Sequence, residues 1–278
     1  MDPLAAAREV AARLGVDADD AVVLHETRTV VVHLRPSPVV ARVSPASEEE
    51  LVRRPVAVTA YLAARGAPVA APWADPGPHY AGDRVVTLWE HVDHDPGRVL
   101  DGFAAGAALR EVHEALAGFE PHDLPLFPRL EEVRRILAGL DVPPAEGRDL
   151  AEMLDRAAAE AARLDVPVQV VHGDAWLGNV LRSPGGPLWT DFELTCVGPR
   201  ELDLACNDTS ARDRGRRPED DAFLVGYGRH DEALRERLAA LELTLLTAWT
   251  YQLAVSRPAY LEHARTRLGW ALEALRRA

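Results

Sequence analysis

The chain has 278 residues, a hydrophobic content of 47% and a net charge of −13. This length allows one large domain or two lobes with a substantial core, and the hydrophobic content predicts a globular rather than a disordered protein. The acidic balance argues against a nucleic-acid-binding protein, because nucleic-acid phosphates need a basic surface. It suits a cationic small molecule, although solubility alone explains most of it.

Several features are missing from the sequence, and each absence excludes a class of protein. No run of eighteen apolar residues predicts a membrane helix, and the N-terminus lacks the pattern of a signal peptide. The two cysteines, Cys196 and Cys206, form no metal-type pair, which favours a cytoplasmic location. The chain contains no lysine, so a Walker A loop is excluded.

The N-terminal third predicts an antiparallel sheet flanked by helices. Residues 2–14 show the apolar spacing of a helix, and β-branched runs at 21–24, 29–34 and 38–43 alternate with turns at 26–28 and 36–38. A helical pattern follows at 48–65, loops at 66–69 and 71–78, and a strand at 83–89. Residues 90–97 change in composition and predict a hinge between lobes.

The remainder of the chain is predicted to be mainly helical. Helical patterns cover residues 99–116, 125–140, 144–164, 200–208, 218–226, 230–255 and 258–275. A charged loop is expected at 212–218. His113, on an apolar helix face, is interpreted as a hydrogen-bonded core residue.

The region around residues 168–191 carries the residues that suggest chemistry. A short strand at 168–171 precedes His172, Gly173 and Asp174, and Asn179 introduces a hairpin with its turn at 183–186. Asp191 follows the returning strand. Because a hairpin brings its ends together, Asp174, Asn179 and Asp191 are predicted to converge. Phosphoryl transfer from ATP needs such a set: a carboxylate for the attacking hydroxyl, and oxygen ligands for magnesium.

The order of these residues resembles the aminoglycoside phosphotransferase family, which includes relatives of choline kinase and is related in fold to protein kinases. The resemblance rests on His172-Gly-Asp174-x-x-x-x-Asn179, on Asp191-Phe-Glu193, and on Gly198-Pro-x-Glu201-Leu-Asp203-Leu-Ala205. It implies a two-lobed α+β protein-kinase-like fold. A small lobe with an antiparallel sheet would span residues 1–90 and bind nucleotide. A larger, mostly helical lobe at 91–278 would carry catalysis and substrate binding.

The resemblance also implies an activity and a set of site residues. The activity is transfer of the ATP γ-phosphoryl group to a hydroxyl of a small acceptor: an aminoglycoside, another antibiotic, an amino alcohol or a sugar. Asp174 would be the catalytic base, and Asn179 and Asp191 would bind magnesium. Arg42 would stand in for the phosphate-binding lysine. The remaining expected contacts are the backbone of Glu90, His91 and Val92 with adenine, and the side chains of Trp176 and Glu193 with the acceptor.

The sequence departs from the family pattern in three places. Arginine stands at 42, and arginine grips phosphate in a planar, bidentate way that lysine does not. Pro55 occupies the helix position where a glutamate would pair with that cation, and proline tends to start a helical segment. The ion pair is then lost or supplied by Glu49 or Glu50. The loop over the phosphates, residues 25–29, contains no glycine.

Two alternatives to a kinase remain open at this point. The departures at Arg42, at Pro55 and in the glycine-free loop would also fit a non-catalytic nucleotide-binding or regulatory protein of the same fold. A metallohydrolase would use His91, His94, His172 and Asp174 as ligands.

Overall fold

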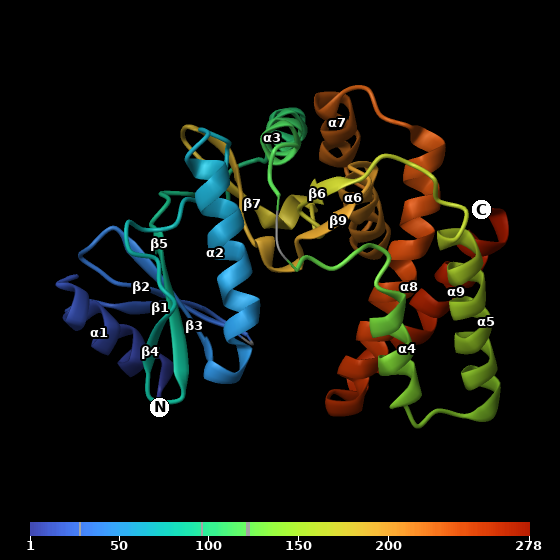
Figure 1. Cartoon of the computed structure of the whole chain (residues 1–278), viewed down its shortest axis with the longest axis horizontal. Coiled ribbons are helices and arrows are strands. Elements are labelled where there is room, and N and C mark those ends of the chain that lie inside the picture. The colour runs from blue at the N-terminus through green and yellow to red at the C-terminus, as the bar shows by residue number, and fades with distance from the viewer. Residues whose placement is uncertain (28, 96, 121–122) are drawn as a thin grey trace. The chain divides into compact units, whose positions relative to one another are not determined.

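The computed structural model describes residues 1–27, 29–95, 97–120 and 123–278, so Arg28 of the predicted turn and Pro96 of the predicted hinge lie outside it. The helices are α1 (Pro3–Leu14), α2 (Glu49–Ala63), α3 (Gly102–Leu116), α4 (Leu130–Ala138), α5 (Pro144–Ala161), α6 (Glu201–Arg214), α7 (Pro218–Tyr227), α8 (Glu232–Ser256) and α9 (Leu261–Arg277). The strands are β1 (Val22–Glu26), β2 (Val30–His33), β3 (Val39–Pro45), β4 (His79–Ala81), β5 (Arg84–Glu90), β6 (Gln169–Val171), β7 (Val180–Ser183), β8 (Gly186–Trp189) and β9 (Cys196–Gly198). Figure 1 shows their course.

The chain divides into two compact units, each described by itself below. Unit 1 comprises Met1–Phe119, Gly178–Leu194 and Val225–Tyr227, and unit 2 comprises Glu120–Leu177, Thr195–Leu224 and Gly228–Ala278. The predicted α+β class, with an antiparallel sheet early in the chain and mostly helices later, is confirmed. The predicted lobe boundary at residue 90 lies between β5 and α3 and stays a prediction.

Unit 1 is built on an antiparallel sheet with strand order β1-β2-β3-β5-β4. Side chains alternate along β3, so Val39, Ala41 and Val43 are buried against α1, while Arg42 points to the face covered by α2. The predicted meander is therefore confirmed. The sequence did not predict β4, because a three-residue strand is too short to show a period of two.

Helix α2 continues through Pro55, which corrects the expectation that this proline would start a helical segment. Proline cannot donate the backbone hydrogen bond to residue 51, which weakens the helix at that turn. Packing compensates for the missing bond, because Val52, Val56 and Leu62 are buried. The Thr59 hydroxyl also donates to the Pro55 carbonyl.

The predicted hairpin is formed by β7 and β8, whose pairs run from Val180 opposite Trp189 to Ser183 opposite Gly186. Trp189 is fully buried, and its indole N–H donates to the Ala105 carbonyl of α3 at 3.2 Å. This anchor fixes the hairpin to the rest of unit 1.

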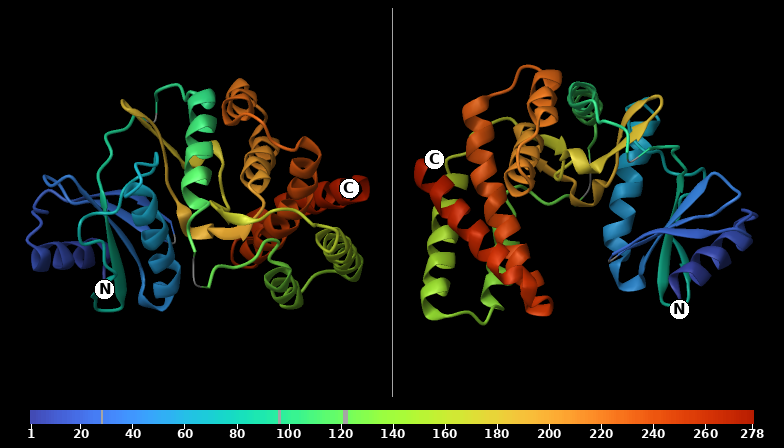
Figure 2. Two further views of the ribbon diagram at one scale, coloured as in Figure 1. Left: turned by 45° about the horizontal axis from the view of Figure 1, so that its top comes forward. Right: turned by 180° about the vertical axis from the view of Figure 1, so that it is seen from behind.

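Unit 2 is a helical assembly around a small two-stranded sheet. Helices α5, α8 and α9 pack together around buried Leu150, Met153, Leu241 and Leu268. Figure 2 shows the course of the chain from two further sides. Strand β6 pairs with β9, a three-residue strand that the sequence did not predict. Helix α6 extends to Arg214, into the residues predicted as a charged loop.

By length and composition alone, α8 could cross a membrane. In this structure 61% of its most apolar window is buried inside the protein, and a packed core helix has the same character. The expectation of no membrane helix stays a prediction.

Candidate active site

The end of the β7–β8 hairpin brings Asn179 and Asp191 together. The backbone N–H of Thr190 donates to the Asn179 carbonyl at 3.0 Å, one step beyond the pairing of Val180 with Trp189. The local turn sets this register, so the sequence was sufficient to predict the meeting of these two residues. Asn179 is buried, whereas Asp191 is 40% exposed.

Asp191 adopts a backbone conformation that is unusual for a residue other than glycine. Its φ is 68°, in the left-handed region, which aspartate tolerates better than most residues. The next residue, Phe192, is 1% exposed and fixes the turn to the core. Strained backbone of this kind persists where the surrounding structure holds it, and it concentrates at functional sites.

Arg42 forms ion pairs with both carboxylates of this turn. Its Nη2 donates to Asp191 Oδ1 at 3.2 Å and also to Glu193 Oε1. The Arg42 side chain is 19% exposed and that of Glu193 is 38% exposed. The structure thus places three predicted site residues of unit 1 in direct contact: Arg42, Asp191 and Glu193.

The suggested ion pair between Arg42 and Glu49 is not formed, and the side chain of Glu50, the other suggested partner, lies outside the described part of the structure. Glu49 instead accepts hydrogen bonds from Arg53, one turn along α2, and from Tyr80 of β4, and these lower the pKa of Glu49. The cation on β3 is paired, but its partners come from the turn after β8. Sequence reasoning named Glu193 only as an acceptor contact, because no local pattern connects residues 42 and 193.

An apolar pocket of about 160 Å³ lies beside Arg42 in unit 1. Sheet residues Leu24, Val31 and Val40 form one part of its wall, and Leu181 of β7 forms another. The segment predicted to contact adenine, residues 90–92, also lines it. A purine ring needs such an apolar slot with a few polar groups at its edge.

Two backbone N–H groups of the segment predicted to contact adenine are already hydrogen-bonded within the protein. The N–H of Glu90 donates to the Ala71 carbonyl and the N–H of His91 donates to the Pro38 carbonyl, both at 2.9 Å. The Val92 carbonyl is 2.9 Å from Nδ1 of His94. An adenine would therefore meet the other backbone groups of this segment.

The His91 ring stacks on His33 of β2, with ring centroids 3.8 Å apart and an angle of 9° between the planes. Burial and the neighbouring His91 ring lower the pKa of His33. Two neutral rings can stack in this way, whereas two charged rings would repel each other.

In unit 2, Asp174 lies on the loop that follows β6, and buried Asp203 of α6 holds this loop. The two oxygens of the Asp203 carboxylate accept the backbone N–H groups of His172 and Gly173 at 2.8 and 2.7 Å. Gly173 has a φ of 81°, which favours glycine. Asp203 thereby fixes the two residues that precede Asp174. The predicted convergence of Asp174 with Asn179 and Asp191 stays a prediction.

Asn207, one turn further along α6, holds the other end of the same loop. Its Oδ1 accepts the Leu177 N–H at 3.2 Å, and its Nδ2 donates to Asp220 Oδ1 at 3.2 Å. Trp176 lies between the two clamped ends and is half-buried. Asp203 and Asn207 were missed as site residues, although a charged residue between Leu202 and Leu204 in a buried helix was a usable signal.

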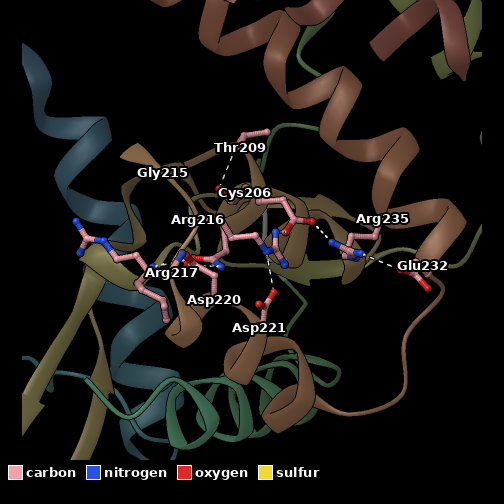
Figure 3. A network of polar contacts seen from close by, with 12 residues as sticks. Cys206, Thr209, Gly215, Arg216, Arg217, Asp220, Asp221, Glu232 and Arg235 are labelled. Carbon is pink, nitrogen blue, oxygen red and sulfur yellow. Dashed lines mark hydrogen bonds and ion pairs between the residues drawn. The ribbon is translucent and has the colours of Figure 1, made fainter. Parts of the chain in front are cut away.

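Arginines surround the outer part of this network (Figure 3). Burial alone would raise the pKa of Asp220, but its bonds to Arg214 and to the Arg217 N–H outweigh burial and lower it. Arg216 bridges Asp208 and Asp221 at 2.9 and 2.7 Å. Ion pairs therefore connect α6 with α7, and this connected region supports the loop that carries Asp174.

The metallohydrolase alternative lacks a suitable set of ligands. In the described part of the chain, no group of three or more His, Cys, Asp or Glu side chains could hold a metal ion. His91 is stacked on His33, and His172 is fully buried. Asn179 and Asp191 suit an ion that takes its remaining ligands from phosphates and water.

A model of the phosphotransferase enzyme family matches residues 22–241. The chain belongs to this family. The match spans the sheet, the apolar pocket, the hairpin and α6, and it confirms the resemblance predicted from the sequence. The protein is an ATP-dependent phosphotransferase that acts on an alcohol group of a small molecule.

Solved structures show the same fold at low sequence identity. An amicoumacin kinase, hAmiN, in complex with AMP-PNP, Ca²⁺ and Ami has a TM-score of 0.74 and 15% identity, with 94% of this chain and 92% of that chain covered. Choline kinase LicA from Streptococcus pneumoniae has a TM-score of 0.73 and 15% identity over 98% of each chain. Aminoglycoside phosphotransferase APH(3'')-Id from Streptomyces rimosus has a TM-score of 0.61 and 19% identity, with 88% and 99% covered.

Proposed function

We propose that the protein transfers the γ-phosphoryl group of ATP to the hydroxyl of a small, amine-bearing acceptor. The observation that carries this proposal is the ion pair of Arg42 with Asp191 beside an apolar pocket of purine size, in a turn to which Asn179 is joined by its backbone. A nucleoside triphosphate and its metal ion require a cation, an amide oxygen and a carboxylate, which these three residues could supply.

The apolar pocket suits the adenine ring, with the backbone of residues 90–92 at its edge. Arg42 lines both this pocket and a second, polar one of about 120 Å³ that Asp191 and Glu193 also line. Phosphates that extend from the purine site would therefore meet the guanidinium of Arg42, which is planar and suited to bidentate contact.

Asn179 and Asp191 are the residues that would hold magnesium, which is usually bound through one or two carboxylates together with substrate phosphates. The ion would supply positive charge against the β- and γ-phosphate oxygens when bound. Asp191 is partly exposed and can reach a ligand, and its carboxylate already carries a counter-charge in Arg42.

Asp174 is the proposed base. As the acceptor oxygen bonds to the γ-phosphorus, the bond from that phosphorus to the β,γ-bridging oxygen breaks and ADP leaves. The hydroxyl proton passes to the Asp174 carboxylate. Asp203 and Asn207 keep the loop in one conformation, so the chain contributes mainly position and charge rather than covalent chemistry.

An amine-bearing acceptor is proposed for two reasons. The net charge of −13 attracts cations to the protein. The structural neighbours are named for amicoumacin, choline and an aminoglycoside. Because these three compounds differ from one another, the proposal covers both amino alcohols and amine-bearing antibiotics. Trp176, half-buried in the Asp174 loop, is the proposed aromatic contact for the cation.

The test is magnesium-dependent release of ADP from ATP in the presence of a panel of acceptors: aminoglycosides, other hydroxyl-bearing antibiotics, choline-like alcohols and neutral sugars. Asp174→Asn should lower turnover by roughly 10² to 10⁴ without weakening ADP binding, because it removes a general base but keeps the shape. Asp155→Asn, at an exposed position of α5 in the same unit, is the matched control.

The outcomes separate the candidate functions. Stimulation by amines that is lost in Asp174→Asn supports the proposal, and stimulation by neutral sugars alone would refute the acceptor class. Tight ADP binding without turnover of any acceptor would instead favour a non-catalytic nucleotide-binding protein.

A further inference from the structure

The cation on β3 is held in an arrangement that the sequence did not predict. Arg42 contacts Asp191 and Glu193, 149 and 151 residues away in the chain, and both belong to the turn after β8. Buried Phe192 lies between the two carboxylate residues and fixes the turn in the core. Both carboxylates are therefore held at one place relative to Arg42.

Helix α2 does not supply this partner through Glu49. That carboxylate is engaged by Tyr80 and Arg53, and Pro55, nearly two turns further along the helix, carries no charge. Leu51 and Val52 of α2 line the polar pocket beside Arg42 instead. Among the described side chains of α2 that line this pocket, the helix contributes apolar wall, and Glu48, directly before the helix, lines the same pocket.

Resting on the proposed function, we propose that Glu193 is the positioning residue for Arg42. Its carboxylate keeps the guanidinium directed at the nucleotide phosphates, and it takes the part that a glutamate on α2 was expected to take. Glu193 acts through Arg42 and is not itself a catalytic residue.

The two carboxylates have different tasks in this arrangement. When Asp191 turns its oxygens to a metal ion, Arg42 loses one of its two partners. Glu193 then remains as the fixed counter-charge. Without Glu193, Arg42 would rest on Asp191 alone and would compete with the metal ion for the same carboxylate. Loss of Glu193 should therefore weaken nucleotide binding and raise the magnesium concentration that this binding requires.

The test is calorimetric titration of the whole chain with ADP and with AMP-PNP, at several magnesium concentrations. Glu193→Gln should weaken binding of the magnesium nucleotide roughly 3- to 10-fold, the scale of a partly exposed charge-assisted contact. Glu49→Gln is the matched control and should bind within about twofold of the wild type, because its partner is Arg53.

A double-mutant cycle separates positioning from a general structural effect. If Glu193 acts through Arg42, then Glu193→Gln should have little further effect in the Arg42→Met background. Glu193→Asp, which keeps the charge, should recover part of the affinity.

Equal binding by the wild type and Glu193→Gln would overturn the inference. So would a Glu193→Gln effect that persists in Arg42→Met, or a Glu49→Gln effect of the same size. If the wild type binds neither nucleotide, the proposed function fails together with the inference. If the wild type binds and only the Glu193 comparison fails, the proposed function stands.

Discussion

The two units each contain a centre of polar residues, and the two centres differ in exposure. In unit 1, Arg42, Asp191 and Glu193 are all partly open to solvent. In unit 2, Asp203 and Asn207 are fully buried, and their polar atoms bond to the backbone of the Asp174 loop.

This difference follows from what each centre has to do. A fully buried carboxylate that accepts two backbone N–H groups is out of reach of a ligand, so it fixes a loop and contributes to stability. A partly exposed ion pair adds little stability, because water screens it, but it can exchange partners with a ligand. The buried centre of unit 2 is therefore suited to positioning and the partly exposed centre of unit 1 to binding, and mutations should separate the two roles.

Asp203→Ala should have the largest effect on stability. It leaves the N–H groups of His172 and Gly173 without their acceptor in a buried place, at a cost of roughly 2 to 6 kcal/mol in the free energy of unfolding. Urea denaturation measures the loss. Asp203→Asn, which keeps one acceptor oxygen, should lie between the wild type and Asp203→Ala, and Asp155→Ala, at an exposed position of α5, should change little. A cost under 1 kcal/mol for Asp203→Ala would contradict the stabilising role that we assign to the buried centre of unit 2.

Glu242→Gln should change how stability depends on pH. Burial raises the pKa of Glu242 from 4.5 to about 7, with Asp203 adding to the shift and Arg129 and Arg267 opposing it. The folded protein prefers the protonated form, so stability present at low pH is lost as pH rises from about 4.5 through 7. The loss is roughly 3 kcal/mol in the wild type.

In Glu242→Gln this loss should be absent. Denaturation curves at pH 5, 6, 7 and 8 test the point, and the difference between the two proteins cancels other groups such as His33. Parallel pH profiles would show that Glu242 is charged throughout and would contradict the prediction.

Gly173→Ala should cost roughly 1 to 2 kcal/mol, because its φ of 81° is unfavourable for a residue with a Cβ atom. It should also lower turnover by moving Asp174. Gly185→Ala, in the hairpin turn, is the control with ordinary backbone geometry. Thermal melting together with ADP release measures both effects, and an unchanged turnover would show that the loop position is not critical.

Arg42→Met should have the smallest effect on stability, below about 1 kcal/mol, because its ion pairs are partly exposed. Nucleotide affinity should nevertheless fall several-fold. Urea denaturation and calorimetric titration of the same sample measure the two quantities. A large loss of stability with normal nucleotide binding would reverse the roles assigned to the two centres.

Much of the fold and of the candidate site could be predicted from residues that are close together in the sequence. The alternation in β2 and β3 predicted the sheet, and the turn at 183–186 predicted the hairpin. That hairpin fixes its own register, so the meeting of Asn179 and Asp191 could be predicted from the short hairpin sequence between them. The order of motifs was then sufficient to indicate the family.

The tertiary structure decided which distant side chains meet. Glu193 rather than Glu49 pairs with Arg42, Asp203 clamps a loop 30 residues earlier, and Pro55 stays inside a helix. None of these contacts leaves a periodic signal in the sequence, because each depends on the packing of separate elements. Local geometry therefore determined the kind of site, and long-range packing determined how its charges are held.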